Sequence, residues 1–328
     1  MNQKLKKALY YTVSLGIGVV LFYLVYNSVE DKEKLWSDMH SASWFGIALS
    51  FAMGYIAIIS RGLRWLILLE PLGHKPNRWH SIHAVSFAYF ANTFVPRSGE
   101  LARCAALNQT DDIPVDELFG TVITERIIDT IMLAIFLISA VVFNLDAFAQ
   151  LSDQFELGGA MSKIPLLIGG VVVLVVLFFL RKRIFASRIG QKIQEFLIGM
   201  KNGVLSVMKI KKKVLFVFHT LLIWTMYFFM AYVIYMTVKA SSLLKLTECL
   251  FIMVAGGLGM IIPAPGGFGS YQYFVKLGFE ALGYEGDLGF ALANIIWVVQ
   301  TGMIVIMGGI GYLALNYYRL KKDRLQNG

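Results

Sequence analysis

Residues 81–108 read SIHAVSFAYFANTFVPRSGELARCAALN, an apolar stretch that breaks in its middle at Pro96-Arg97-Ser98-Gly99. The run before the break, 81–95, is shorter than the roughly 20 residues that a helix needs to cross a bilayer. A second short run, 249–262, ends at Pro263-Ala264-Pro265-Gly266-Gly267. Proline removes a backbone donor and interrupts a helix. Both stretches are therefore predicted to be broken helical hairpins.

Long apolar runs surround these two segments. Hydrophobic residues make up 57% of the 328 residues and charged residues 16%, whereas soluble proteins average roughly 45–50% apolar. Helices that are apolar on every face are stable only in lipid. The fold class is therefore predicted to be all-α, a polytopic membrane protein with about six full spans and two broken, re-entrant hairpins. The six predicted spans are 8–26, 44–69, 118–145, 164–180, 214–238 and 287–315.

The basic residues set the expected orientation. The formal net charge is +9, and ten basic side chains gather in 181–213 against the single acid Glu195. Lys and Arg mark the cytoplasmic side of a membrane protein, so this segment and both termini are expected in the cytoplasm, with the chain in the inner cell membrane. Segments 27–43 and 146–162 are acidic or neutral and are expected outside. The charge reports orientation and does not indicate a nucleic-acid partner.

This orientation holds only if 81–108 enters from the cytoplasm and returns there, and 249–283 enters from outside and returns outside. Two hairpins of opposite sense, one in each half, are typical of inverted-repeat transporters, whose broken elements mark the substrate site. The alternative is that each stretch, with its partner, forms one or two kinked full spans. A single membrane domain, 1–328, is expected. Its two halves are 1–180 and 214–318, and an amphipathic cytoplasmic segment, 181–213, joins them.

Charges within membrane helices are expensive, so each one needs a reason. Arg61 and Arg64 lie three residues apart on one face of the predicted span 44–69, where they are placed to hold a lipid phosphate. The alternative is that both arginines extend to the membrane interface, with Trp65 as an interfacial anchor.

The break of the first hairpin is dense in polar groups: Asn92, Arg97, Glu100 and Arg103. The helix that follows the break presents its N-terminus at this point, and such a terminus attracts anions. Glu100 and Arg103 are three residues apart and are expected to pair. A simple loop does not need this many polar groups in an apolar stretch, so a functional role is predicted.

A third group, Glu125, Arg126 and Asp129, stands at the cytoplasmic end of the span 118–145. Glu125 and Asp129 share a helix face, and Arg126 is expected to reach Asp129. Two interpretations stay open. The carboxylates form a structural cross-link to Arg97 or Arg103, or one of them carries protons.

The second break contains Pro265, Gly266, Gly267 and Gly269, followed by Gln272. Proline forbids a continuous helix here, and glycine permits tight turns and close approach of other groups. A broken helix at membrane depth is tolerated where it is buried in protein or lines a cavity. These residues are predicted to line a cavity; the alternative is a plain extracellular turn.

Other reactive side chains do not form a recognisable site. His74, His80 and His83 are interpreted as interfacial histidines, and no metal is expected. Cys104 and Cys249 are far apart and are interpreted as small buried hydrophobes. No phosphate-binding loop of the ATPase type occurs, so neither a cofactor nor ATP hydrolysis is expected.

Taken in order, three motifs resemble those of the flippase-like membrane family, the transmembrane domain of lysyl-phosphatidylglycerol synthases that is also found as stand-alone proteins. They are Asn92…Pro96-Arg97…Gly99-Glu100…Arg103, Glu125-Arg126…Asp129, and Pro263-x-Pro265-Gly266-Gly267-x-Gly269, and Arg61-x-x-Arg64-Trp65 also fits the family pattern. The resemblance covers about residues 8–316. It implies translocation of a lipid, typically a modified phospholipid, between leaflets.

Two features qualify what the resemblance implies. The chain ends a few residues after its last predicted span, so the soluble synthase activity of larger members is not expected. Members often carry a glutamate where this sequence has Gln272, so the step that such an acid serves stays open here.

The sequence is therefore interpreted as a lipid translocase and not an enzyme, with a membrane lipid bearing a phosphate-containing headgroup as its partner. Arg97 and Arg103, with Arg64, are expected to neutralise the phosphate. The acids Glu100, Glu125 and Asp129 are expected to hold those arginines or to balance a cationic headgroup. The glycine-rich break is expected to supply a gate. Whether the protein forms a homo-oligomer stays open.

Two alternatives from other classes stay open. The first is a membrane-embedded lipid or glycosyl transferase, for which Asp111-Asp112 is the candidate acidic motif, although this pair is expected to cap the next helix. The second is a non-transporting scaffold or partner in cell-envelope biogenesis.

Overall fold

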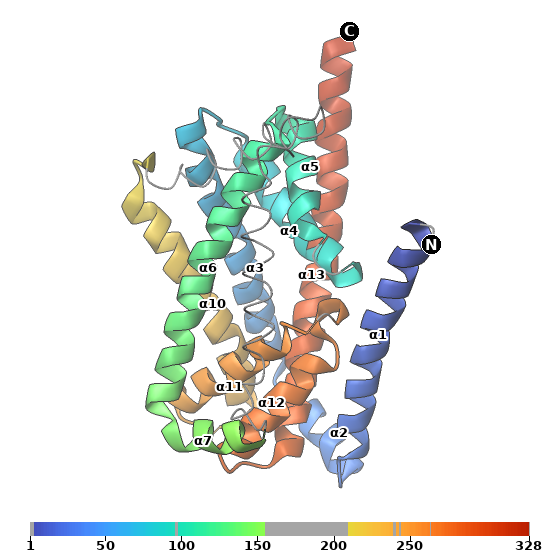
Figure 1. Cartoon of the computed structure of the whole chain (residues 1–328), viewed down its shortest axis with the longest axis vertical. Coiled ribbons are helices and arrows are strands. Elements are labelled where there is room, and N and C mark those ends of the chain that lie inside the picture. Colours follow the sequence, from blue (N-terminus) through green and yellow to red (C-terminus); the bar gives the residue numbers. More distant parts are fainter. Residues whose placement is uncertain are drawn as a thin grey trace, which may run out of the picture.

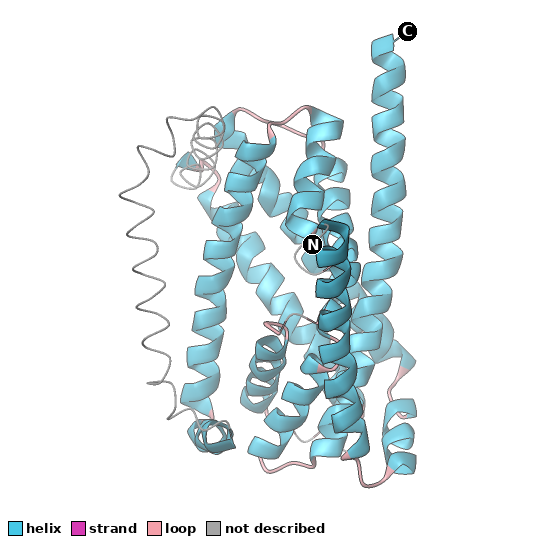
Figure 2. Cartoon of the chain, turned by 45° about the vertical axis from the view of Figure 1, so that its right-hand side comes forward, coloured by secondary structure: helices cyan, strands magenta, loops and turns pink. Residues whose placement is uncertain are grey.

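The computed structural model describes residues 3–95, 98–154, 209–238, 241, 242, 244–262 and 264–327. Within these residues every regular element is a helix, as Figure 2 shows, and the all-α prediction is confirmed. The elements, in chain order, are α1 (Gln3–Asn27), α2 (Lys32–His40), α3 (Trp44–Leu69), η1 (Glu70–Leu72), α4 (Arg78–Phe94), α5 (Gly99–Asp111), α6 (Val115–Phe143), α7 (Leu145–Gln154), α10 (Lys213–Thr237), α11 (Leu246–Gly259), η5 (Pro265–Gly267), α12 (Ser270–Ala281) and α13 (Gly286–Asn327).

Four described helices are long and apolar enough to cross a membrane: Trp44–Leu72, Val115–Phe143, Lys213–Thr237 and Gly286–Arg324. They coincide with four of the six predicted spans. Helix α1 follows the first predicted span, 8–26, and its apolar part is Leu15–Asn27. The predicted span 164–180 and most of the predicted amphipathic segment 181–213 lie outside the described residues.

Helix α13 runs past its predicted end at residue 315 and ends at Asn327. The extra turns are held to the first half of the chain by polar contacts. Lys322 Nζ lies 2.5 Å from Asp112 Oδ2, and Arg319 Nη1 donates to Gln109 Oε1 at 3.3 Å. The helix continues past the predicted span, and these contacts hold its additional polar turns.

Helices α3 and α10 pack closely because α3 carries small residues on the shared face. A Cβ atom added at Gly46 would clash with the Thr237 side chain, and one at Gly54 would lie 3.5 Å from Met230 Sδ. Ser50 Oγ donates to the Met230 carbonyl at 2.8 Å. Glycine and serine let the two backbones approach, and this contact joins the two halves of the chain.

The two predicted hairpins are present. Helices α4 and α5 form the first hairpin, and α11 and α12 form the second. In each hairpin the two arms lie side by side, so kinked full spans do not describe either stretch. At the tip of the first hairpin, Gly99 N donates to Asn92 Oδ1 at 2.7 Å. In the second hairpin the two backbones approach closely, since a Cβ at Gly259 would lie 2.6 Å from the Ser270 carbonyl oxygen.

The hairpins enter from opposite ends of the molecule and meet in its middle (Figure 1). The first starts at the end where the C-terminus lies, and the second starts at the end where α2 lies. Their tips are in contact, since a Cβ atom at Gly266 would lie 3.8 Å from Thr93 Cγ2. Each half therefore has the order helix, hairpin, helix: α3, first hairpin, α6, and then α10, second hairpin, α13.

Helix α1 packs against the tip of the second hairpin. A Cβ at Gly269 would clash with the Gly18 carbonyl, and one at Gly18 would lie 2.7 Å from the Phe268 carbonyl oxygen. The rings of Phe22 and Phe268 stack with centroids 4.7 Å apart. Glycine on both sides lets α1 lie directly on the broken segment.

The expectation that Asp111-Asp112 caps the next helix is wrong. Asp112 ends α5 instead, in the left-handed conformation with φ 56°, which aspartate tolerates better than most residues. Asp111 Oδ2 accepts from His80 Nδ1 at 2.9 Å. Helix α6 starts after Pro114, which stands at its N-cap without a side-chain hydrogen bond.

Candidate functional site

Five buried charged side chains lie together between α3, α5 and α6: Arg61, Arg64, Arg103, Glu125 and Asp129. Arg61 Nη1 lies 2.6 Å from Asp129 Oδ2, and Arg64 Nη2 lies 2.9 Å from Asp129 Oδ1. Arg103 Nη2 lies 2.5 Å from Glu125 Oε2, and Arg64 Nη2 lies 3.5 Å from Glu125 Oε1. Isolated charges are strongly disfavoured away from water, and paired ones are tolerated. We call this connected set the charge cluster.

Trp65 is closely packed beside the charge cluster. A Cβ atom at Gly62 would lie 2.8 Å from Ile82 Cα, so this glycine brings α4 against α3. Trp65 is fully buried and donates from Nε1 to Thr121 Oγ1 at 2.8 Å. The Arg103 guanidinium carbon lies 4.7 Å from the centroid of the Trp65 ring, a cation–π contact.

The alternative interpretation of Arg61 and Arg64, as interfacial arginines with Trp65 as an anchor, is therefore wrong. All three side chains are buried. They stay inside because the carboxylates of α6 neutralise the arginines and the threonine of the same helix accepts from the indole. A single helix does not reveal such partners, because they come from another part of the chain.

The ion pairs differ from those expected within single helices. Glu100 pairs with Arg126 at 3.0 Å rather than with Arg103, and Arg103 pairs with Glu125. Asp129 pairs with the arginines of α3 rather than with Arg126. The first hairpin places α5 beside α6, so facing residues offer shorter contacts than neighbours three residues away. The cross-link of Glu125 to Arg103 is present, and the proton-carrying role of a carboxylate stays a prediction.

Hydroxyl groups from α4 and α10 extend the network. Arg61 Nη2 donates to Tyr227 Oη at 3.5 Å, and the hydroxyls of Tyr227 and Tyr89 lie 2.7 Å apart. Arg64 Nη1 donates to Thr220 Oγ1 at 3.3 Å. The charge cluster is thus bound by side chains from both halves of the chain.

A small polar cavity of about 120 Å³ adjoins the charge cluster. We call it the central cavity. Two arginines of the cluster form part of its wall, and the Glu100–Arg126 pair forms another part, with its side chains 25% and 51% exposed. The lining residues are Arg61, Val85, Ala88, Tyr89, Asn92, Gly99, Glu100, Arg103 and Arg126.

Several polar atoms in the wall of the central cavity are buried without a hydrogen-bond partner in the described part of the chain. They are Arg61 Nε, Arg103 Nη1 and Glu100 Oε2. A buried polar atom without a partner is costly. The residues that line the cavity therefore include both donors and a carboxylate acceptor that lack a partner.

The tip of the second hairpin is neutral. Gly266, Gly267 and Gly269 have φ values of 58°, 69° and 79°, a region that favours glycine. Gln272 is fully buried and accepts through Oε1 from Gly269 N at 2.8 Å. Trp297 Nε1 donates to the Gly266 carbonyl at 2.8 Å. These bonds satisfy the backbone that Pro265 and the glycines release from helical pairing.

The structure separates the predicted site residues into two groups. Most of them form the charge cluster and central cavity: Arg61, Arg64, Asn92, Glu100, Arg103, Glu125, Arg126 and Asp129. The others form the neutral tip and do not line that cavity: Pro265, Gly266, Gly267, Gly269 and Gln272. The two groups adjoin where the hairpin tips meet. Arg97 lies outside the described residues.

Sequence reasoning missed Tyr89, Tyr227 and Thr220. Tyr89 could have been predicted from the sequence, because it stands three residues before Asn92 and shares its helix face. Tyr227 and Thr220 sit in an apolar span rich in aromatic residues, and nothing in the local sequence separates them from packing residues. Asn294 was also missed; its Oδ1 lies 3.5 Å from Gln272 Nε2.

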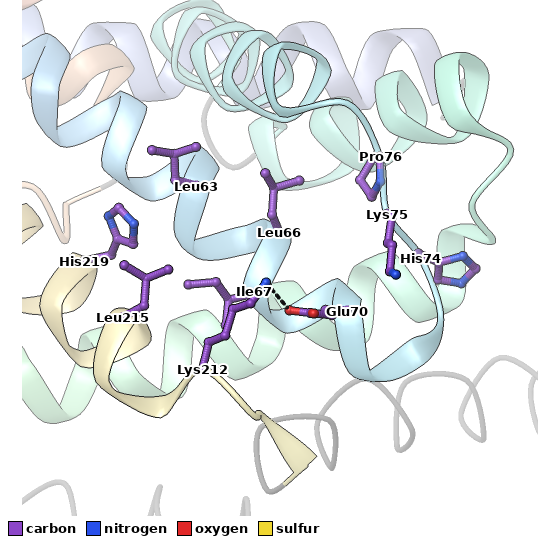
Figure 3. A pocket seen from close by; sticks show the side chains of 10 residues that line it. All are labelled: Leu63, Leu66, Ile67, Glu70, His74, Lys75, Pro76, Lys212, Leu215 and His219. Atoms are coloured by element: carbon purple, nitrogen blue, oxygen red, sulfur yellow. Dashed lines mark ion pairs between the residues drawn. The ribbon is translucent and has the colours of Figure 1, made fainter.

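A larger and more open pocket, of about 490 Å³, lies between the end of α3 and the start of α10 (Figure 3). Its base is apolar, with Leu63, Leu66 and Leu215. The Lys212–Glu70 ion pair, 3.0 Å long, bridges its edge. His219 lines this pocket, and its Nδ1 lies 2.8 Å from Ser60 Oγ.

His74, before α4, and His80, in its first turn, have carboxylate partners that the sequence did not indicate. His74 Nε2 lies 2.8 Å from Glu117 Oε2, and His80 Nδ1 lies 2.9 Å from Asp111 Oδ2. Asp111 stands at the outer end of α5, outside the spanning helices. Burial is the largest influence on its carboxyl group and raises its pKa, but hydrogen bonds from His80 and Thr110 outweigh burial, and the pKa lies below its ordinary value. No group of three metal-ligating side chains occurs among the described residues.

The two predicted free cysteines, Cys104 and Cys249, are both buried and unbridged. Each packs in an apolar core, Cys104 against Trp65 and Leu107 in one cluster, and Cys249 beside Ile252 in another. The interpretation of both as small buried hydrophobes is confirmed.

The sequence of this chain is similar to those of other membrane proteins. The family model of the lysylphosphatidylglycerol synthase TM region matches residues 11–308. UPF0104 membrane protein PH1989 of Pyrococcus horikoshii is 23% identical over 323 residues, covering 92% of this chain and 95% of that protein. UPF0104 membrane protein MJ1595 of Methanocaldococcus jannaschii is 23% identical over 292 residues, covering 82% of this chain and 84% of that protein.

Proposed function

The chain belongs to the lysylphosphatidylglycerol synthase TM region family, and from that premise we propose that this membrane protein moves a phospholipid or modified lipid between the two leaflets. The proposal includes no chemical reaction and no ATP hydrolysis at the site. It places the protein in the cytoplasmic membrane with both termini in the cytoplasm, so that the first hairpin opens to the cytoplasmic side.

One observation carries the proposal. A buried, arginine-rich charge cluster adjoins a polar cavity at the depth where the tips of two opposed hairpins meet. Burying Arg61, Arg64 and Arg103 away from water is expensive, and hydrophobic side chains of similar size give equal or better stability. Ionisable groups inside a membrane protein generally mark a pathway for a polar substrate. A cavity walled by arginine suits the phosphate of a lipid headgroup.

The proposed mechanism keeps the acyl tails in the bilayer while the headgroup crosses through the central cavity. Arg103 and Arg61 bind the phosphate, because both have buried nitrogen atoms without partners. Glu125 and Asp129 hold these arginines in position. The half-exposed Arg126, paired with Glu100 at the wall, attracts the phosphate to the cavity, and the pair opens to admit the headgroup.

The second hairpin serves as the gate in this mechanism. Its tip has three glycines at positive φ and contacts the tip of the first hairpin through Gly266 and Thr93. Such a segment changes its backbone conformation at small energetic cost. Movement of this tip opens the central cavity to the opposite side of the membrane.

A reconstitution experiment tests the proposal. The purified full-length protein is placed in liposomes with headgroup-labelled lipids, and a membrane-impermeant quencher reports exchange between leaflets. We expect headgroup-dependent exchange that falls at least about tenfold in Arg126→Gln. Arg78→Gln is the matched control, because Arg78 is exposed at the outer end of the same hairpin and lies over the Trp79 ring.

Two results would contradict a translocase. Absence of exchange with every lipid, from protein with a normal thermal unfolding midpoint, favours the transferase or the scaffold. Equal exchange in Arg126→Gln and the unmodified chain removes the central cavity from the transport path.

A further inference from the structure

The charged groups around the central cavity do not balance. The described residues of the charge cluster and the cavity wall contain four guanidinium groups and three carboxylates, which leaves one positive charge in excess. The guanidinium groups are those of Arg61, Arg64, Arg103 and Arg126, and the carboxylates are those of Glu100, Glu125 and Asp129.

The excess charge lies on residues that line the cavity. Arg64 lies on the far side of the cluster, where it contacts both acids of α6 and Thr220 and does not line the cavity. Arg61 and Arg103 do line it, and each has a buried nitrogen atom without a partner in the described part of the chain. A charge that is removed from water strongly favours a bound counter-charge. One negative charge in the cavity therefore completes the site.

The cavity also contains an acceptor that a bare anion leaves unsatisfied. Glu100 lines the cavity, and its Oε1 pairs with Arg126 while its buried Oε2 has no hydrogen-bond partner among the described residues. A carboxylate oxygen accepts but does not donate. A ligand that presents a donor close to its phosphate, either a hydroxyl or an ammonium group, satisfies this oxygen.

Charge decides between these two donors. A zwitterionic headgroup with an ammonium group brings no net charge, so the excess positive charge of the site stays uncompensated. A headgroup esterified with a basic amino acid brings a net positive charge and adds to the excess. A phosphodiester with hydroxyl substituents brings one negative charge and the donor together, and so satisfies both requirements.

Building on the proposed function, we propose that the central cavity selects an anionic phosphodiester headgroup that carries a hydroxyl-bearing substituent, with the phosphate on Arg103 and Arg61 and a hydroxyl on Glu100. The volume agrees with a compact group. The cavity measures about 120 Å³ and is the smaller of the two cavities described above. A phosphate with a short polyol suits this space better than a long aminoacyl chain.

Binding measured apart from transport tests this selectivity. The full-length protein in detergent is titrated with short-chain lipids by isothermal titration calorimetry: phosphatidylglycerol, phosphatidic acid, phosphatidylethanolamine and lysyl-phosphatidylglycerol. We expect phosphatidylglycerol to bind at least about tenfold more tightly than the zwitterionic and cationic lipids. Phosphatidic acid, which has the phosphate without the polyol, is expected to bind several-fold less tightly than phosphatidylglycerol.

Two variants separate the charge from the donor requirement. Arg126→Gln removes the excess charge, so phosphatidylglycerol and phosphatidylethanolamine are expected to bind with similar affinity. Glu100→Gln replaces the carboxylate acceptor with a weaker amide, so the preference for phosphatidylglycerol over phosphatidic acid is expected to fall. Arg78→Gln is the control for both and is expected to keep every ratio. Thermal unfolding midpoints show that each variant is folded.

The outcomes distinguish this inference from the translocase proposal. Tightest binding of lysyl-phosphatidylglycerol or phosphatidylethanolamine overturns the headgroup inference, even where liposome assays show exchange. Selective binding of phosphatidylglycerol without exchange of any lipid supports the headgroup site and overturns the translocase. Ratios that stay the same in both variants place the selectivity elsewhere and overturn the inference.

Discussion

The first hairpin, α4 and α5, and the second hairpin, α11 and α12, share one architecture and differ in chemistry. Both have two short helices whose arms lie side by side and whose tips meet in the middle of the molecule (Figure 1). The first is backed by the charge cluster, with Arg103 of α5 bound to Glu125 of α6. The second ends in glycines and a neutral amide, Gln272.

This difference in chemistry indicates that the two hairpins differ in how easily they move. Charge that is fixed by ion pairs gives selectivity but resists movement, because separating buried partners is expensive. Backbone at positive φ that is held by single hydrogen bonds moves more easily. This difference agrees with the proposed mechanism, in which the first hairpin binds the headgroup and the second moves. Substitutions in the two hairpins test this contrast.

Removing one buried charge should have the largest effect. Arg103→Met leaves Glu125 with only the longer contact to Arg64, 3.5 Å, and is expected to lower the free energy of unfolding by about 3–5 kcal/mol. Gln272→Met in the second hairpin leaves the Gly269 N–H unpaired and is expected to lower it by about 1–3 kcal/mol. Denaturant titration of the purified protein measures both.

A double variant tests the reason for the first loss. Replacing Glu125 together with Arg103 removes both partners of the ion pair, and part of the lost stability is expected to return. Equal losses in the two hairpins, or no recovery in the double variant, would show that the contrast in charge does not set the contrast in stability.

Backbone geometry is tested at the tip of the second hairpin. Gly269→Ala places a Cβ on a residue with φ 79°, against the Gly18 carbonyl, and is expected to lower the free energy of unfolding by about 1–3 kcal/mol. Gly257→Ala, in helix α11 with open space around it, is the matched control and is expected to be neutral or stabilising by about 0.5–1 kcal/mol. Similar losses at both glycines would argue against a tip that requires glycine.

The contribution of the outer end of the first hairpin to the free energy of unfolding should depend on pH. The folded-state pKa of Asp111 lies below its ordinary value, so its carboxylate stabilises the protein above the unfolded-state pKa of about 3.9 and this stability is lost as pH falls through the folded-state pKa. Asp111→Asn is expected to lower the free energy of unfolding by about 1 kcal/mol at pH 7, and the difference should shrink in acid. Unfolding is measured from pH 7 to pH 3.

Asp323→Asn, at an exposed position of α13, is the control for this pH series and is expected to follow the unmodified protein throughout. A difference between Asp111→Asn and the unmodified chain that stays constant down to pH 3 would exclude the carboxylate as its source.

The smallest effect is expected at the outer end of the second hairpin. Lys34 of α2 pairs with Glu285 at 2.6 Å, but both side chains are about half exposed, at 49% and 53%. Exposed ion pairs contribute little to stability. Lys34→Gln is expected to leave the thermal unfolding midpoint unchanged, and a clear decrease would show that α2 holds the second hairpin more firmly than its exposure indicates.

Much of this fold follows from local sequence. The apolar runs at 44–69, 118–145 and 214–238 each became a helix of nearly the predicted bounds, and α13 begins where the run 287–315 predicts, because a helix satisfies its own backbone polar groups wherever it lies. The two hairpins follow from proline and glycine, which act on the few residues around them. The length of α13 does not follow, since its last turns depend on Asp112 and Gln109.

The candidate site was only partly predictable. The charged residues were identifiable because charge is rare in membrane helices, and most of them do lie together. Their pairing was not, since Glu100 and Asp129 each have a closer partner on another helix than on their own. The hydroxyls of Tyr227 and Thr220 were missed because an apolar span gives no signal that distinguishes them.

The sequence by itself determined that this chain is a helical membrane protein, where its helices break and which side chains carry charge. Those properties depend on residues within one or two helical turns. Only the arrangement of the helices in space brings the two tips together and places three arginines and two carboxylates in one buried cluster beside a cavity. Those properties depend on the rotation and direction of helices that are far apart in the chain, and the energy of an ion pair changes over a few ångströms.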